Sequence, residues 1–357
     1  MRGRVRARRT KMVAAVAAVL MFAATACSTD ESAVDAQGNV DLSKVTLNVG
    51  EFGPYVQAIY EASGALDDVA YKINWVDGIS EAQPLFSGIK AGAIDIGIMG
   101  DIPVTTGIAS GAKFKIVNAG LKVSDADKVD PGSALVVVAP KNSDINGPAD
   151  LKGKTLVTTQ GSAVEYLAYL YAKSGGVAWD DIKKKYLTAD KALTAFTAGD
   201  VQVWASYPPG TQKVLADGSA KLLTAATGTG NLLAGSQLQW VAADDALADP
   251  AKKAAIKDFI SRQGKVNEWG KANVDKLPEI SAKALNLPAG QVSSTWTYTI
   301  FDQLPLDEKT IESYQQTADN LYDAGIVPHQ VEVKPYFSTE FADLVTPVTE
   351  VPGTGGN

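Results

Sequence analysis

Several short stretches of the chain alternate apolar and other residues, and most of them are followed by a helical pattern. The clearest alternations are Val45, Leu47 and Val49; Ile94, Ile96 and Ile98; and Val201, Val203 and Ala205. Alternation with a period of two predicts half-buried strands, whereas apolar residues at i, i+3 and i+4 predict helices. Strands that alternate with helices are typical of an α/β fold.

The same reasoning predicts most of the elements of the body. The expected strands are residues 45–49, 71–76, 94–98, 134–139, 155–159, 201–205 and 237–242. The expected helices are residues 55–62, 80–91, a helix that begins near 101, and residues 162–174, 189–198, 251–270 and 307–324. In the third of these helices we expect Asp101 as the N-cap and Pro103 in the first turn.

One phrase occurs twice. Leu85-Phe86 leads through Gly92 to a strand at Ile96, and Ala195-Phe196 leads in the same way through Gly199 to Val203. Two similar α/β lobes would produce this repeat of helix, glycine and strand. About 310 residues lie between the polar ends, which is enough for two lobes with separate cores.

Residues 151–167 combine a strand rich in β-branched residues, a tight turn at Gly161 and a helix with Ser162 as its N-cap. The first N–H groups of such a helix lack intrahelical partners and carry the positive end of the helix dipole. An anion fits there without a lysine. The alternative is simple capping, because Ser162 and Glu165 have the spacing of a capping box and would satisfy donors internally.

The first 26 residues are predicted to be an export signal, with six basic residues before an apolar run that ends near Ala24. Cys27, the only cysteine, follows small residues and resembles the lipidation site of bacterial lipoproteins. The alternative is an incidental thiol. Residues 27–44 are then a lipidated cysteine and a flexible tether, and the lipid anchors the protein to the extracytoplasmic face of the cell membrane.

Charge and composition exclude several classes of function. The chain has a net charge of −7 and the signal carries six positive charges, so the mature chain is at −7 − 6 = −13, which argues against nucleic-acid binding. The lone histidine, His329, lies in a turn and gives no sign of a catalytic triad. No histidine and cysteine spacing can hold zinc. Residues 147–155 superficially resemble a P-loop, but their glycine spacing is wrong and they precede a strand. We therefore expect no metal, no cofactor and no enzymatic activity.

Four segments, taken in order, resemble the aliphatic sulfonate-binding proteins of ABC importers. They are residues 87–103, 150–154 together with 160–162, 195–204 and 324–328. That family belongs to a wider group with taurine and nitrate binders. The resemblance extends from about residue 45 to 335.

The resemblance implies a two-lobed periplasmic-binding-protein fold of type II, with the ligand in a cleft that closes about a hinge. Lobe 1 would be residues 45–137 plus 242–335, lobe 2 residues 138–241, and residues 336–357 a tail. The matching ligand-binding positions are Gly100 and Asp101 in lobe 1, Gly161, Ser162 and Ala163 in lobe 2, and a third wall of Glu51, Phe52, Gly53 and Tyr55. Trp204 and Tyr207 would cover the organic part of the ligand, although core packing is an equal alternative for Trp204.

Two departures from the family pattern bear on the ligand. Tyr207-Pro208-Pro209 stands where family members often have Trp-Asp-Pro, so a cleft carboxylate is missing. Glu165 places a negative charge in the first turn of the proposed anion-binding helix. Turned inward it would repel a sulfonate or favour a ligand with an amine, whereas a capping role would do neither.

The sequence therefore predicts a lipid-anchored, monomeric receptor that binds a small organic sulfonate and delivers it to an ABC permease and its ATPase. A receptor for taurine, nitrate or a pyrimidine precursor is the nearest alternative. An enzyme built on the same fold and a scaffolding lipoprotein without a ligand cleft are two further alternatives.

Overall fold

The computed structural model describes residues 33–51, 54–76, 79, 82–124, 135–207, 210–226, 237–286, 288 and 299–344. The predictions for the export signal, Cys27, Phe52, Gly53, Pro208 and residues 345–357 lie outside the described residues.

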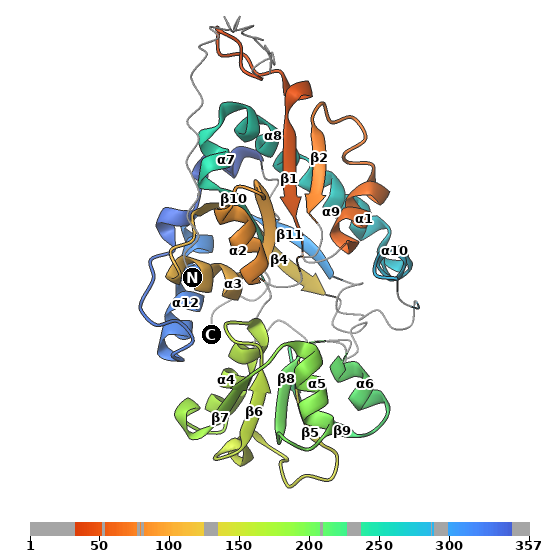
Figure 1. The fold of residues 1–357 in the computed structure, drawn as a ribbon, viewed down its shortest axis with the longest axis vertical. Helices are drawn as coiled ribbons and strands as arrows, with labels where there is room; N and C mark the ends of the chain where they lie inside the picture. Colours follow the sequence, from red (N-terminus) through yellow and green to blue (C-terminus); the bar gives the residue numbers. More distant parts are fainter. Residues whose placement is uncertain are drawn as a thin grey trace, which may run out of the picture. The chain divides into compact units, whose positions relative to one another are not determined.

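Two separate sheets organise the described residues (Figure 1). The six-stranded sheet contains β1 (Thr46–Gly50), β2 (Lys72–Val76), β3 (Ile96–Gly100), β4 (Phe114–Ser124), β10 (Gln237–Ala243) and β11 (Thr299–Leu304). The five-stranded sheet contains β5 (Val136–Pro140), β6 (Thr155–Thr158), β7 (Lys183–Tyr186), β8 (Val203–Ser206) and β9 (Ala220–Ala225).

Helices cover both faces of each sheet. They are α1 (Tyr55–Ser63), α2 (Ala82–Lys90), α3 (Asp101–Ala109), α4 (Ala163–Ser174), α5 (Ala189–Thr197), α6 (Gly210–Ala216), α7 (Asp244–Ala248), α8 (Pro250–Ser261), α9 (Gln263–Ala272), α10 (Leu277–Ala284) and α12 (Glu308–Asp323). Six short 3-10 helices complete the described elements: Leu42–Lys44, Pro148–Leu151, Trp179–Asp181, Val274–Lys276, Lys334–Tyr336 and Thr339–Leu344. The expected helix over residues 251–270 is two helices, α8 and α9, which meet at Arg262.

The two sheets have the same internal order. The first runs β2-β1-β3-β10-β4 with β11 added at its edge, and the second runs β7-β6-β8-β5-β9. In each sheet three parallel strands are followed by one antiparallel strand. The repeated phrase of the sequence ends at equivalent strands, because β3 and β8 both occupy the third position. The two halves of the body are thus built to one plan.

The antiparallel strands also show where the chain changes sheets. Val136–Pro140 lies wholly in the five-stranded sheet and Gln237–Ala243 wholly in the six-stranded sheet. The expected lobe boundaries after residues 137 and 241 therefore fall inside strands. The division into lobes stays a prediction, and the strands place both crossings a few residues earlier.

Apolar side chains make a core on each side of the second sheet. Val137, Leu156 and Ala205 pack with α4 on one face, whereas Val136, Val157 and Trp204 pack with α5 and α6 on the other. Successive strand residues point to opposite faces, so this partition follows directly from the sequence. Both faces are covered, which is why these strands are almost wholly apolar.

In the first sheet, aromatic rings join α1 and α8 to the strands. Tyr60 stacks on Phe259 with 5.2 Å between ring centroids, and Trp240 of β10 meets Phe259 edge-on at 5.1 Å. On the opposite face, α2 and α12 pack through Phe86 and Tyr314.

The predicted tether and tail are partly wrong. Val34 and Val40 form a β-bridge, and both side chains pack on the core of the first sheet together with Leu42. Phe337 and Phe341 are buried in the same core. Residues 33–44 and 336–344 therefore belong to the folded body, because short apolar residues spaced between polar ones anchor them to it.

Candidate functional site

The N-terminus of α4 has the geometry that the sequence predicts. Ser162 is its N-cap, in extended backbone with φ −108° and ψ 163°, and its hydroxyl accepts a hydrogen bond from Glu165 N at 3.3 Å. The same hydroxyl donates to Thr159 O, so its proton is already used within the loop. Gly161 has φ +67°, a left-handed conformation that favours glycine.

Glu165 turns back onto the loop that precedes the helix. Its carboxylate accepts hydrogen bonds from Gly161 N and from the Tyr186 hydroxyl, each at 2.6 Å. The side chain is 1% exposed, and burial raises the pKa of this carboxyl although both hydrogen bonds lower it. In a capping box this carboxylate would accept a hydrogen bond from Ser162 N. Here it accepts one from Gly161 N, one residue earlier, so Glu165 has the expected capping role with a different backbone partner.

This arrangement leaves main-chain donors at the start of α4. Among the described residues, the N–H groups of Ser162, Ala163 and Val164 have no hydrogen-bond partner. They belong to the first turn, where the helix dipole is positive. Three convergent neutral donors can hold an anion, with a buried carboxylate close behind them.

The start of α3 differs from the expectation. Gly100 is the N-cap, with φ −75° and ψ 165°, and Asp101 is the first helical residue. The predicted N-cap at Asp101 was therefore wrong by one residue, because a glycine at the strand end takes the extended cap conformation. Pro103 lies in the first turn, as predicted.

The donors of this second helix start are already used. Ile102 N donates a hydrogen bond to Asp101 Oδ1 at 2.9 Å, and the N–H of Asp101 itself also donates to this carboxyl. Pro103 has no N–H. The geometry thus gives no support to an anion site at Gly100 and Asp101.

Asp101 is a buried acid in an aromatic setting. It is 3% exposed, and burial raises its pKa to about 7, with the hydrogen bonds from Ile102 N and its own N–H acting in the opposite direction. Its charge contributes to the raised pKa values of Tyr166 on α4 and Tyr314 on α12, although burial is the larger cause for both. Asp101 therefore lies near α4, which packs on the five-stranded sheet, and near α12, which packs on the six-stranded sheet.

The loop after β1 uses another buried acid. Glu51 is 4% exposed, and its carboxylate accepts a hydrogen bond from Gln57 N at 2.8 Å, within the first turn of α1. Burial and the Glu51 charge both raise the pKa of Tyr55. Glu51 and Tyr55 are thus close together.

Trp204 and Tyr207 have different surroundings. Trp204 is 1% exposed and packs against Phe196 at 5.5 Å between ring centroids, so it occupies the core beneath α5 and α6. Tyr207 is half-buried in the loop after β8, at the edge of the other core. The core alternative describes Trp204, and Tyr207 keeps the exposure that a ligand contact needs.

The loop before α4 lies against α3. A Cβ atom placed on Gly161 would lie 3.4 Å from Thr106 Cγ2, and Ile102 shares a core with Val164 and Leu167. Thr106 and Tyr186 were missed by sequence reasoning. Thr106 carries no local signal, since it lies inside an ordinary helix, and Tyr186 ends a run of three lysines that reads as solvent-exposed.

The remaining chemistry is modest. His329 is exposed, and its ring nitrogens lie 3.1 Å from Ala109 O and 3.0 Å from Gln330 O. Within the described ranges, no group of three or more His, Cys, Asp or Glu residues is arranged to hold a metal ion. No helix in this part of the chain is long and apolar enough to cross a membrane.

The topology matches that of solved binding proteins. The alkanesulfonate-binding protein SsuA from Xanthomonas axonopodis pv. citri, solved with bound MOPS, aligns with a TM-score of 0.65 at 26% identity, covering 82% of this chain and 98% of that one. The desulfurization enzyme DszB aligns with a TM-score of 0.58 at 13% identity, covering 84% and 97%, which shows a shared fold alone. The chain therefore has the periplasmic-binding-protein fold.

Sequence comparison gives the family. A protein of Escherichia coli strain K12 that carries the name of an aliphatic sulfonates-binding protein is 27% identical over 267 residues, which cover 74% of this chain and 78% of that protein. The NMT1/THI5-like family model matches residues 85–262. Over this segment the chain is similar to the NMT1/THI5-like family.

Proposed function

We propose that this chain is the solute-binding component of an ABC importer and that it binds alkanesulfonates or related small organic sulfonates. The observation that carries the proposal is the start of α4, where three main-chain N–H groups have no partner among the described residues. The names of the similar proteins in Escherichia coli and Xanthomonas support the sulfonate class.

The binding mode follows from the donor set. The sulfonate oxygens accept hydrogen bonds from Ala163 N and Val164 N, and Ser162 N completes the ring of donors. Hydrogen bonds to a charged group contribute roughly 1.5–3 kcal/mol each. Tyr207 contacts the organic part, and Glu51 with Tyr55 forms another wall. Closure of the two lobes about the crossings at β5 and β10 traps the ligand.

The cellular setting is part of the same proposal. Residues 1–26 direct export, Cys27 carries the lipid anchor, and the loaded receptor delivers its ligand to a permease and an ATPase on the extracytoplasmic face of the membrane. The protein acts as a monomer and carries out no chemical step on its ligand.

Thermal unfolding tests the proposal. The chain produced from Ser28 onward, which retains the compact unit that begins at Ala33, is heated with alkanesulfonates, aromatic sulfonates, taurine, nitrate, sulfate and pyrimidines. A ligand at 100 times its Kd adds about 2.7 kcal/mol, which raises Tm by several degrees. A rise with sulfonates supports the proposal, whereas a melting temperature that no sulfonate changes contradicts it.

A receptor for a zwitterionic aminoalkanesulfonate such as taurine is the second candidate. Three buried carboxylates, those of Glu51, Asp101 and Glu165, lie at the starts of α1, α3 and α4. Such a concentration of acids favours a ligand that carries an amine beside its sulfonate. Taurine and ethanesulfonate have nearly the same size, so their Kd values for the wild-type chain decide between the two candidates.

A further inference from the structure

Tyr186 holds the carboxylate that lies behind the proposed anion donors. Its hydroxyl donates a hydrogen bond to Glu165 Oε1 at 2.6 Å, and the other carboxylate oxygen accepts one from Gly161 N at the same distance. Glu165 is 1% exposed, so its carboxylate, if it lost one of these donors, would have to find another or take up a proton. The two hydrogen bonds therefore decide where this negative charge lies.

The edge strand β7 carries Tyr186 to this place. Tyr186 pairs with Thr158, the last residue of β6, and Leu187 N donates a hydrogen bond to Thr158 O at 3.0 Å. Thr159 Oγ1 donates another to Leu187 O at 3.4 Å. These bonds hold β7 to the loop before α4 without the tyrosine hydroxyl, and the Tyr186 side chain is 39% exposed. Removing the hydroxyl alone should therefore leave the strand and the fold in place.

Lys184 is the charged residue of β7 on the same face as Tyr186, because successive strand residues alternate between faces. Its ammonium group donates a hydrogen bond to Trp179 O at 3.1 Å. Burial raises the pKa of Glu165, and among the contacts that lower this pKa the hydrogen bond from Tyr186 is the largest and the charge of Lys184 a smaller one. The tyrosine hydroxyl is thus the main contact that holds this charge.

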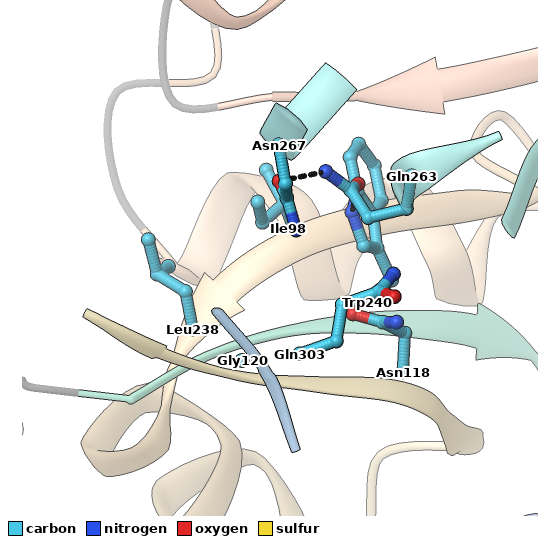
Figure 2. A pocket seen from close by; sticks show the side chains of 8 residues that line it. All are labelled: Ile98, Asn118, Gly120, Leu238, Trp240, Gln263, Asn267 and Gln303. Carbon is cyan, nitrogen blue, oxygen red and sulfur yellow. Dashed lines mark hydrogen bonds between the residues drawn. The ribbon is translucent and has the colours of Figure 1, made fainter. Parts of the chain in front are cut away.

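A buried amide elsewhere in the chain shows how two donors fix one acceptor. Gln263 Oε1 accepts hydrogen bonds from Trp240 Nε1 at 2.9 Å and from the Tyr60 hydroxyl. Its Nε2 therefore points the other way and donates to Asn267 Oδ1 at 2.8 Å (Figure 2). Glu165 is likewise held by a tyrosine hydroxyl and a second donor.

The groups next to Glu165 make its position matter. The N–H groups of Ser162, Ala163 and Val164 have no partner among the described residues. In a capping box, a glutamate at this position of the helix accepts a hydrogen bond from the N–H of the N-cap residue, here Ser162. A carboxylate released by Tyr186 can therefore turn to these donors, where it would compete with an anionic ligand.

We propose that Tyr186 is a positioning residue of the anion site, whose hydroxyl keeps the carboxylate of Glu165 on Gly161 and away from the free N–H groups of α4. This inference rests on the proposed function, which supplies the ligand. Tyr186 acts through Glu165, so its effect on affinity disappears when residue 165 has no carboxylate. Without the hydroxyl, the start of α4 becomes a closed cap like the start of α3.

A double-mutant cycle tests the inference, with an alkanesulfonate titrated calorimetrically at about pH 8, where a glutamate is normally ionised. Tyr186→Phe should weaken binding about fivefold to twentyfold, because the freed carboxylate occupies the donors. Glu165→Met keeps a side chain of similar length that is a poor acceptor, and it should rescue the loss. In that background Tyr186→Phe should change the Kd less than about twofold.

Tyr71→Phe is the matched control. It also removes a tyrosine hydrogen bond to a carboxylate, that of Asp258 on α8, at 3.0 Å. The Kd of this variant should stay within about twofold of the wild-type value, because no carboxylate is released near α4. An equal loss in both tyrosine variants would overturn the specific role of Tyr186.

A crystal structure of ligand-free Tyr186→Phe is the second arm. It should show the Glu165 carboxylate within hydrogen-bond distance of Ser162 N or Ala163 N. The inference is overturned by a carboxylate that stays on Gly161, by a variant that binds as tightly as wild type, or by a loss that persists in the Glu165→Met background. If the wild-type chain binds no sulfonate, the proposed function fails, while the position of this carboxylate still decides whether Tyr186 holds it.

Discussion

The starts of α3 and α4 occupy similar places in sequence, each after a parallel strand, yet they offer opposite environments to an anion. At α4, Glu165 reaches back to Gly161 and the next three N–H groups have no partner among the described residues. At α3, the carboxylate of Asp101 accepts a hydrogen bond from Ile102 N, and Pro103 has no N–H. An acidic side chain placed two residues earlier in the helix therefore converts a potential site into a closed cap.

This difference shows that a strand–loop–helix pattern by itself does not define a binding site. What matters is where the first acidic side chain of the helix finds its donors. The following changes test the comparison, beginning with the largest expected effect.

Ser162→Pro should remove binding at α4. The change deletes one N–H, disturbs the cap and shifts Ala163 N and Val164 N, since proline disfavours the φ of −108° found here. Loss of two hydrogen bonds to a charged ligand costs on the order of 3–6 kcal/mol, a loss of affinity of at least a hundredfold. Isothermal titration with the sulfonate identified by thermal unfolding measures it.

Thr188→Pro is the matched control for that variant. Thr188 is the N-cap of α5, a helix that packs on the same five-stranded sheet. Its φ of −64° suits proline, and its side chain makes no cap hydrogen bond. Its affinity should remain within twofold of wild type. Equal losses in both variants would mean that proline harms the fold rather than the site.

Asp101→Asn should change the pH dependence of stability. The pKa of Asp101 rises from 3.8 to about 7 on folding, so the folded state binds more protons between these values and the free energy of unfolding falls as pH rises. Between pH 4 and pH 7 the wild-type chain should lose up to roughly 4 kcal/mol that the variant retains. Urea unfolding at a series of pH values measures the difference, and parallel curves would show that Asp101 ionises normally.

Glu165→Gln should strengthen the binding of a sulfonate without an amine by about threefold to tenfold, because a negative charge leaves the positive end of α4. A glutamine can keep contacts with both Gly161 N and Tyr186. The raised pKa of Glu165 also predicts tighter binding by the wild-type chain as pH falls, and this dependence should vanish in the variant.

Glu61→Gln changes the net charge equally on the exposed face of α1 and should leave affinity unchanged. If the ligand carries an amine, Glu165→Gln weakens binding instead. An unchanged affinity for either type of ligand would remove Glu165 from the site.

Trp204→Phe should produce the smallest effect on binding. Trp204 fills the core between β8 and α5, so its truncation lowers stability by roughly 1–3 kcal/mol while the Kd for the sulfonate stays within twofold. Urea unfolding and titration of the same sample separate the two quantities. A tenfold loss of affinity at normal stability would restore Trp204 as a ligand contact.

Local patterns in the sequence were enough to predict strands β1, β2, β3, β5, β6, β8 and β10 and helices α1 to α5. The β1 and β8 regions show a clear alternation of apolar residues, and the β6 region is rich in β-branched residues. The strands β7 and β9, at the two edges of the second sheet, were missed. The sequence of β7 is Lys-Lys-Lys-Tyr, which carries no apolar signal. Strands β4 and β11 were also missed.

The candidate site was predictable in part. Ser162 as a cap follows from local spacing, because the cap and its partner are three residues apart. The contacts of Glu165 with Tyr186 and of Gly161 with Thr106 join residues 21 and 55 positions apart, and no local pattern contains them. The closure of α3 by Asp101 depended on a shift of one residue in the cap, which falls within the normal uncertainty of helix ends.

The most direct test is a crystal structure of the chain with an alkanesulfonate bound. We predict sulfonate oxygens at about 2.7–3.2 Å from Ala163 N and Val164 N, with Glu165 still bonded to Gly161 and no sulfonate oxygen at Asp101. A sulfonate bound at the start of α3, or anywhere that leaves the α4 donors without a ligand oxygen, would contradict the account.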